Sequence, residues 1–264
     1  MNPRGERRPA MSAIRRTLEA LANPYSFPRE VLRNGFLDRR TRATDWFEYR
    51  AAVSRIHAAR RATEGALRSA RAEDLFAGLE RAEATVSLTA ATPYNISLQE
   101  LLVICAITKL QRPDSVFEFG TFDGRTTLHL AMNAPTNAKV YTLDIQAGCF
   151  EFGGDARYLA PIRVGQCFLD SPYQSRIEAI TGDSRGIDLA SHSGAIDLVF
   201  VDADHSYRAV LSDSRIAFEM VRPGGVVLWH DYLMIEDVTR ALIEIGKTRP
   251  LVHIAGTTLA VMKA

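Results

Sequence analysis

The stretch "SVFEFGTFDGRTTLHLA", residues 115–131, joins three local patterns that together decide the fold class. Its first part, "SVFEFG" (115–120), is a short apolar run typical of a buried strand. A turn containing Gly120 and Gly124 follows, and a helix is expected from Thr126. A buried strand, a glycine turn and a helix in direct succession are typical of an α/β fold with a parallel sheet.

The chain after this stretch repeats the alternation of strand and helix. Further strands are predicted at 139–144, 176–183, 195–202 and 226–231, the last after a "RPGG" turn. Helices are predicted near 97–110, where Ser97 and Glu100 form a capping box, and near 207–221 and 235–246. The closing "LVHIAGTTLAVMK" (251–263) predicts two strands around a glycine turn, hence an antiparallel hairpin at the edge of a parallel sheet.

The first 92 residues differ from the rest of the chain in hydrophobic pattern and in charge. Apolar residues at helical spacing predict helices near 43–70 and 72–86, so we expect a helical extension (1–92) before the α/β domain (93–264). The extension has 17 arginines against 11 acidic residues, and the rest has 15 basic against 20 acidic residues. The arginines are dispersed, which favours a solvated surface over a nucleic-acid site. The extension is expected to cap the substrate pocket or to make a homo-oligomer contact.

Composition restricts the class of protein. The 264 residues are 47% hydrophobic, enough for a large core. The chain lacks a run of eighteen apolar residues, and no apolar stretch follows its basic start, so neither a membrane span nor secretion is expected. Its three cysteines form no C-x-x-C pair, which indicates a reducing compartment and a cytoplasmic protein.

Polar residues gather where the predicted strands end. In an open α/β sheet, ligands bind beyond the carboxyl ends of the strands. The residues at these ends, strand by strand, are Glu118, Gly120, Asp123 and Gly124; Asp144; Gly182, Asp183 and Ser184; Asp202, Asp204 and His205; and His230 and Asp231.

The charges of these residues discriminate between cofactors. A strand–glycine–helix unit with an acid after the next strand occurs in both dinucleotide-binding and S-adenosylmethionine (SAM)-binding folds. The turn here lacks G-x-G-x-x-G spacing, and carboxylates would repel a pyrophosphate but suit the sulfonium and ammonium groups of SAM. Gly120 and Gly124 would then let the backbone approach the methionine part of SAM. Glu118 would lie near the ammonium group, and the start of the helix at Thr126 would receive the carboxylate. Asp144 would bind the ribose. Asp183 with Ser184 would accept the adenine amino group. The full predicted cofactor set is Glu118, Gly120, Thr121, Gly124, Thr126, Asp144, Ile145, Gly182, Asp183, Ser184 and Asp202.

These motifs resemble the class I SAM-dependent methyltransferases, and more narrowly the family often called methyltransferase domain 24. The resemblance covers about residues 97–264 and rests on "FEFGTFDGRTTLHLA", "YTLDI", "ITGDS", "IDLVFVDADHSY" and "VRPGGVVLWHDY", in the order of that family. It implies a Rossmann-like sheet of seven strands, SAM as the methyl donor and a small-molecule acceptor.

Two kinds of relatives, the catechol-like and the macrocin-type O-methyltransferases, imply roles for the acidic ends of the fourth and fifth strands. By match of position, Asp202 and Asp231 would hold a divalent cation such as Mg²⁺, with His230 beside them, and His205 would be the general base. His230 stands where these relatives place an acid, and a nitrogen ligand suits manganese, iron or zinc better than magnesium. The alternatives are that His205 supports the site from outside or caps a helix, and that His230 positions the substrate or packs beside Trp229. Asp202 could instead contact SAM, and Asp231 could be structural.

Three other functions stay open at the level of sequence. The arginine-rich extension could direct the same domain to RNA. The protein could bind SAM or another metabolite without turnover. A nicotinamide-dependent dehydrogenase is the third alternative, because the glycine turn alone does not exclude it.

Overall fold

The computed structural model of the chain describes residues 66–89, 95–145 and 163–264. They belong to one compact unit, residues 64–264. Its strands are β1 (Arg68–Ala70), β2 (Ser115–Phe119), β3 (Lys139–Asp144), β4 (Ile177–Thr181), β5 (Ile196–Val201), β6 (Val221–Trp229), β7 (Val252–Ile254) and β8 (Ala260–Lys263). Its α-helices are α4 (Ala72–Leu75), α5 (Leu98–Gln111), α6 (Arg125–Asn133), α7 (Tyr207–Met220) and α8 (Glu236–Gly246), and three short 3₁₀ helices lie at Leu79–Arg81, Gln174–Arg176 and Ala190–His192.

The strands form one mixed sheet with the order β1-β7-β8-β6-β5-β2-β3-β4. All neighbours are parallel except β6 with β8 and β7 with β8. The prediction of a Rossmann-like, mostly parallel sheet with a closing antiparallel hairpin is therefore confirmed. The chain proceeds outward from β2 through β3 to β4 and, on the other side, from β5 to β6, so β2 and β5 form the switch point where ligands bind in such folds.

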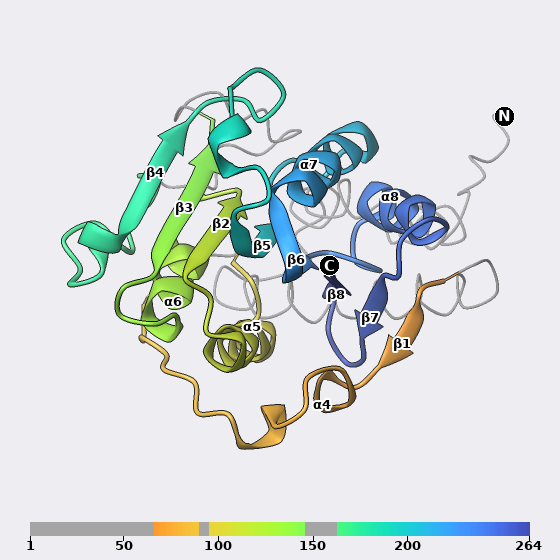
Figure 1. Cartoon of the computed structure of the whole chain (residues 1–264), viewed down its shortest axis with the longest axis horizontal. Coiled ribbons are helices and arrows are strands. Elements are labelled where there is room, and N and C mark those ends of the chain that lie inside the picture. Colours follow the sequence, from red (N-terminus) through yellow and green to blue (C-terminus); the bar gives the residue numbers. More distant parts are fainter. Residues whose placement is uncertain (1–65, 90–94, 146–162) are drawn as a thin grey trace, which may run out of the picture. The chain divides into compact units, whose positions relative to one another are not determined.

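Both faces of the central strands are buried, because α5 and α6 cover one face and α7 and α8 the other (Figure 1). Successive residues of the central strands alternate between two cores. Val116, Leu198 and Leu228 pack on the α5/α6 side, while the residues that follow them, Phe117, Val199 and Trp229, pack on the α7/α8 side. This explains why the strands read as continuous apolar runs in the sequence.

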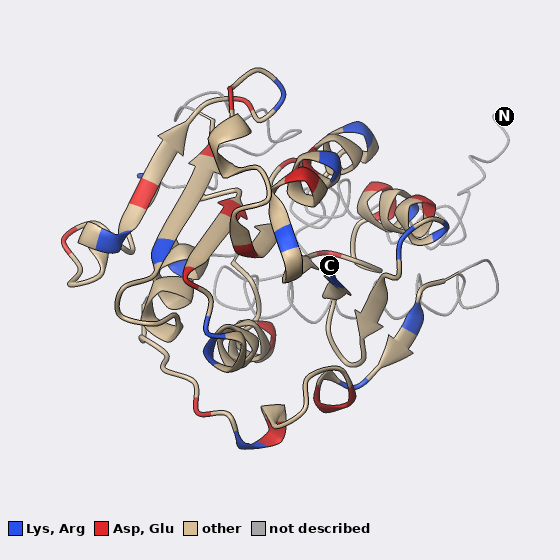
Figure 2. Ribbon diagram, in the orientation of Figure 1, with Lys and Arg blue, Asp and Glu red and all other residues tan. Residues whose placement is uncertain are grey.

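The helices begin at the signals that the sequence contains. Ser97 caps α5, its hydroxyl accepting a hydrogen bond of 3.2 Å from the backbone amide of Glu100. Ser206 caps α7 in the same way, with the amide of Ala209 as donor at 3.4 Å. Acidic and basic residues are interspersed on the outer turns of α7 and α8 (Figure 2), as expected of helices that bury only one face.

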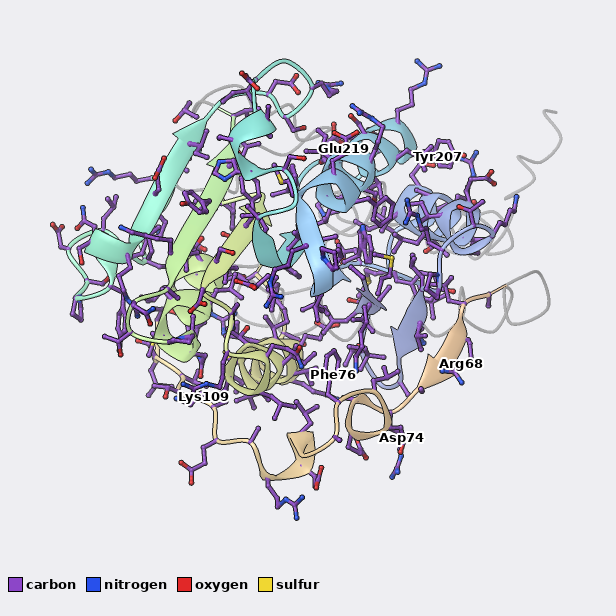
Figure 3. The ribbon with its side chains drawn as sticks, viewed as in Figure 1. Arg68, Asp74, Phe76, Lys109, Tyr207 and Glu219 are labelled. Carbon is purple, nitrogen blue, oxygen red and sulfur yellow. The ribbon has the colours of Figure 1, made fainter. Side chains whose placement is uncertain are left out.

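The expected helices of the extension are wrong in the part that the structure describes. Residues 68–70, predicted helical, form β1, which pairs in parallel with β7 and adds an eighth strand. Between 72 and 86 only α4 and the turn Leu79–Arg81 are helical. Phe76, labelled in Figure 3, follows α4 and is buried in the α5/α6 core. Segment 66–89 therefore contributes to the sheet and its core, and the helix expected over 43–65 lies outside the described residues.

One strand begins earlier than predicted. The "RPGG" segment, expected to be a turn, lies inside β6, which starts at Val221 opposite Ile196 and continues after a register shift.

Among the described residues, none of the helices combines the length and apolar character that crossing a membrane would need.

Candidate functional site

Two histidines and two aspartates meet where β5 and β6 end. Asp202 and His205 follow β5, and His230 and Asp231 follow β6, its parallel neighbour. The Nε2 atom of His205 lies 3.1 Å from Oδ2 of Asp231 and 3.4 Å from Oδ1 of Asp202. Because parallel neighbours end at the same edge of a sheet, residues 25 or more positions apart form one cluster, as the sequence predicts.

His230 faces the same two carboxylates from the other side. Its Nδ1 atom lies 3.3 Å from Oδ1 of Asp202 and 3.4 Å from Oδ1 of Asp231. The two histidines differ in exposure: the His230 side chain is 10% exposed and the His205 side chain 35%. His205 is therefore the one that a molecule arriving from solvent can reach.

A third carboxylate joins the cluster from helix α5, and sequence reasoning missed it. Glu100 is 7% exposed, and its Oε2 atom lies 3.5 Å from Nε2 of His230. Its other oxygen accepts hydrogen bonds from the backbone amide (2.6 Å) and the hydroxyl (2.7 Å) of Thr258. The sequence shows Glu100 only as a capping-box residue, and its contact with His230 becomes visible only once α5 packs against the sheet.

The cluster is strongly charged. Burial lowers the pKa of His205, but the Asp202 and Asp231 carboxylates raise it more, to about 10. Burial is likewise outweighed at His230, whose pKa the same two carboxylates hold well above the usual value. Burial raises the pKa of Glu100, yet hydrogen bonds from His230, Ser97 and Thr258 lower it to about 2. The neighbouring carboxylates therefore favour the charged form of both histidines.

The donor set fits a divalent cation. Asp202, His205 and Asp231 each offer one ligand atom, and the three atoms lie within 4.8 Å of one another. His230 lies at hydrogen-bond distance from the same carboxylates and is an alternative nitrogen donor. Two carboxylates with one or two imidazoles suit manganese, iron or zinc better than magnesium, which prefers an all-oxygen shell.

Glu118 lies behind this cluster at the end of β2. It is fully buried, and its Oε2 atom accepts hydrogen bonds from the hydroxyls of Thr127 and Thr142. Its Oε1 atom has no hydrogen-bond partner among the described residues. Burial raises the pKa of Glu118 to about 8, although the two threonines lower it. A buried acceptor without a partner fits the predicted role of receiving the ammonium group of SAM.

Asp144 borders a cavity of about 200 Å³ at the ends of β3 and β4. Its two carboxylate oxygens accept hydrogen bonds of 2.7 Å from the backbone amides of Phe122 and Ile145, which aim the carboxylate beside the glycine turn. The cavity is lined by Thr121, Asp144, Ile145, Arg163, Val164, Ala179, Ile180 and Thr181. Thr121, Asp144 and Ile145, three of the predicted cofactor residues, thus line one cavity whose wall is partly apolar. This combination fits a ribose and its base.

The two glycines of the turn serve packing within the fold. Gly120 has φ +95°, and a β-carbon there would lie 2.1 Å from the carbonyl oxygen of Asp202. Gly124, with φ +79°, precedes α6, and a β-carbon there would lie 2.6 Å from the ring of Phe168. Other parts of the protein therefore occupy the space that a side chain would need at each glycine. Thr126, the second residue of α6, is half-buried beside this turn.

The residues after β4 have other partners. Asp183, predicted to bind adenine, forms a bidentate pair with Arg185 at 2.7 and 2.9 Å, and hydrogen bonds from Arg185 lower its pKa to about 2. The hydroxyl of Ser184 donates to Asp213 at 2.6 Å. Neither lines the cavity at Asp144, nor does Gly182, which contacts Ile187.

The segment that begins at residue 163 docks on the glycine turn. The amide of Gly165 donates to the carbonyl of Phe122 (2.9 Å) and that of Cys167 to the carbonyl of Asp123 (2.8 Å). Phe168 is buried between Gly124 and Gly165. Asp204 accepts a hydrogen bond from the backbone amide of Ser206 and so supports the start of α7.

The chain is similar to known methyltransferases. Residues 117–232 match the family model described as a methyltransferase domain. Caffeoyl-CoA O-methyltransferase 2 of Petunia hybrida and caffeoyl-CoA O-methyltransferase 3 of Nicotiana tabacum are each 26% identical over 143 residues, which are 53% of this chain and 56% of theirs. The chain thus spans about half the length of the curated relatives it matches.

Solved structures support the fold. A Staphylococcus aureus protein provisionally described as a caffeoyl-CoA O-methyltransferase superimposes with a TM-score of 0.51 at 14% identity, covering 73% of this chain and 90% of that one. Sheet order and the family match both indicate that residues 117–232 are similar to a methyltransferase domain. The expected resemblance to this class of enzymes is therefore confirmed.

Proposed function

We propose that this protein is a SAM-dependent O-methyltransferase of a hydroxylated small molecule. One observation carries the proposal: the backbone of Asp202 packs directly on Gly120, so the histidine–aspartate cluster adjoins the turn expected to receive SAM. The O-methyltransferase names of the relatives support the same reaction. In this arrangement Asp144 binds the ribose and Glu118 the ammonium group of the donor.

His205 is the general base of the proposed reaction. The acceptor oxygen forms a bond to the methyl carbon while the bond from carbon to sulfur breaks, which leaves S-adenosylhomocysteine and transfers the hydroxyl proton to His205. His205 suits this role better than His230 because it is 35% rather than 10% exposed. Asp231, 3.1 Å from its Nε2, holds the ring in place.

Asp202, His230 and Asp231 are the proposed ligands of a divalent cation. When bound, such a cation supplies positive charge that lowers the pKa of an acceptor hydroxyl. The cation would also offset the negative charges of Asp202 and Asp231, which raise the pKa of His205 to about 10. The pKa of His205 would then fall, and its ring would be neutral, as a general base must be.

A methyl-transfer assay tests the function. The full chain is incubated with SAM and a panel of catechols and hydroxylated phenylpropanoid thioesters, with Mn²⁺, Mg²⁺ or a chelator, and S-adenosylhomocysteine and the methylated product are measured by mass spectrometry. We expect turnover that His205→Ala abolishes and Asp204→Ala, an exposed neighbour on the same turn, preserves. Binding of S-adenosylhomocysteine without methylation of any acceptor would contradict the proposal and favour a binding protein.

We propose that the reaction takes place in the cytoplasm. Cys105 and Cys167 are free thiols, which suits the reducing cytoplasm. A homo-oligomer and a pocket completed by the N-terminal extension stay predictions. The RNA alternative depends on the extension, of which residues 1–65 lie outside the described part of the chain.

A further inference from the structure

Glu100 has more hydrogen-bond partners than a helix cap requires. Its carboxylate accepts the hydroxyl of Ser97 at 2.7 Å and both the amide and the hydroxyl of Thr258, and it lies 3.5 Å from Nε2 of His230. Ser97 starts α5, whereas Thr258 lies between β7 and β8, 158 residues from Glu100. The carboxylate is therefore fixed from two distant parts of the chain before it meets His230.

The ring of His230 is consequently held at both nitrogens. A carboxylate that is ionised can only accept, so Nε2 carries the hydrogen atom that points to Glu100. Nδ1, on the opposite side of the ring, faces Asp202 at 3.3 Å and Asp231 at 3.4 Å. In this tautomer Nδ1 is the atom that offers a lone pair toward the two aspartates once it carries no proton.

We propose that Glu100 is the positioning residue that makes His230 a nitrogen ligand of the cation held by Asp202 and Asp231. The inference rests on the proposed cation site and deepens it. Histidine ligands commonly donate their second N–H to a carboxylate, which sets the tautomer and makes the ring a better donor. The site is thereby suited to a nitrogen-binding divalent ion such as Mn²⁺, Co²⁺ or Zn²⁺ rather than Mg²⁺.

Glu100→Gln is the sharpest variant because it keeps the size and one accepting oxygen for Thr258. The amide that replaces the second oxygen donates instead of accepting, which favours hydrogen on Nδ1 of His230 and turns the lone pair away from the aspartates. We expect E100Q to weaken Co²⁺ binding about 10- to 100-fold, measured by calorimetry and by the visible absorption of bound Co²⁺. Binding of S-adenosylhomocysteine should stay within about threefold of the wild type.

A double-mutant cycle separates positioning from a merely structural role. In the His230→Ala background, E100Q should have no further effect on Co²⁺ affinity, because the ring through which it acts is gone. Ser97→Ala removes one partner of Glu100 and the cap of α5, and it should weaken Co²⁺ binding less than E100Q does, because Thr258 still fixes the carboxylate. An equal loss from E100Q with and without His230, or a wild-type Co²⁺ affinity of E100Q, would overturn the inference.

A measurement on the wild type covers the case in which E100Q does not fold. Long-range ¹H–¹⁵N spectra of the Zn²⁺-loaded protein should show His230 coordinated through Nδ1 and protonated on Nε2. Coordination of His205 in its place would overturn the inference but leave methyl transfer possible. Coordination of His230 as expected, with no methylated product from any acceptor, would contradict the proposed function and leave the inference on Glu100 intact.

Discussion

The carbonyl oxygen of Asp202 lies so close to Gly120 that a β-carbon on the glycine would be 2.1 Å from it. The amide of Asp202 also donates to the carbonyl of Phe119 at 2.9 Å. The glycine turn after β2 and the acidic end of β5 are therefore built as one unit. The position of the histidine–aspartate cluster relative to the predicted cofactor site depends on the absence of a side chain at residue 120.

Gly120→Ala should destabilise the protein by at least about 2 kcal/mol, because it adds a steric clash with backbone to the cost of a left-handed conformation at φ +95°. The free energy of unfolding in urea measures this loss. Gly194→Ala is the control, since Gly194 has φ +63° but nothing within 4 Å, so only the conformational cost of about 1 kcal/mol applies. Equal losses for the two variants would mean that the contact with Asp202 is unimportant.

Asp231→Asn should weaken Mn²⁺ binding at least about tenfold and lower turnover in parallel, because the variant loses one charged ligand. Asp231 has φ +61°, a conformation that asparagine adopts easily, so the backbone should keep its shape. Calorimetry with Mn²⁺ and the methyl-transfer assay provide the two readouts. Unchanged Mn²⁺ affinity would remove Asp231 from the ligand set.

Asp144 and Asp183 should differ in their effect on cofactor binding. Asp144 borders the cavity, whereas Asp183 is paired with Arg185. We expect Asp144→Asn to weaken S-adenosylhomocysteine binding about 10- to 100-fold, the value of a charged hydrogen bond, and Asp183→Asn to weaken it less than about threefold. Calorimetric titration of both variants decides this, and an equally large effect of D183N would restore its predicted role at the adenine.

The stability of the cofactor-free protein should depend on the ionisation of Glu118. Its folded pKa of about 8 exceeds the ordinary value of 4.5, so between these values the folded state binds the proton and the unfolded chain does not. Stability from this group is present below about pH 4.5 and is lost as the pH rises to about 8, by up to about 1.4 kcal/mol per pH unit.

Glu118→Gln stays neutral and keeps an acceptor for Thr127 and Thr142. The difference in melting temperature between E118Q and the wild type should therefore shift in favour of E118Q as the pH rises across this window. Thermal unfolding of both proteins at several pH values measures it. A pH-independent difference would show that Glu118 ionises normally in the folded protein.

Much of the fold could be predicted because its signals are local. The strands from β2 to β8 and the helices from α5 to α8 lie close to the predicted ranges, since apolar runs, glycine turns and caps act within a few residues. β1 could not be predicted, because three residues are too short for a pattern and it exists only through its pairing with β7.

The sequence by itself determined which residues reach the edge of the sheet. Asp202, His205, His230 and Asp231 follow two adjacent parallel strands, so their meeting follows from chain order and strand direction alone. Only the tertiary structure decided which further contacts the strand-end residues make. The packing of α5 and the turn at Thr258 placed Glu100 on His230, and Asp183 came to pair with Arg185. Such contacts join residues far apart in the chain or depend on side-chain orientation, for which the local pattern contains no signal.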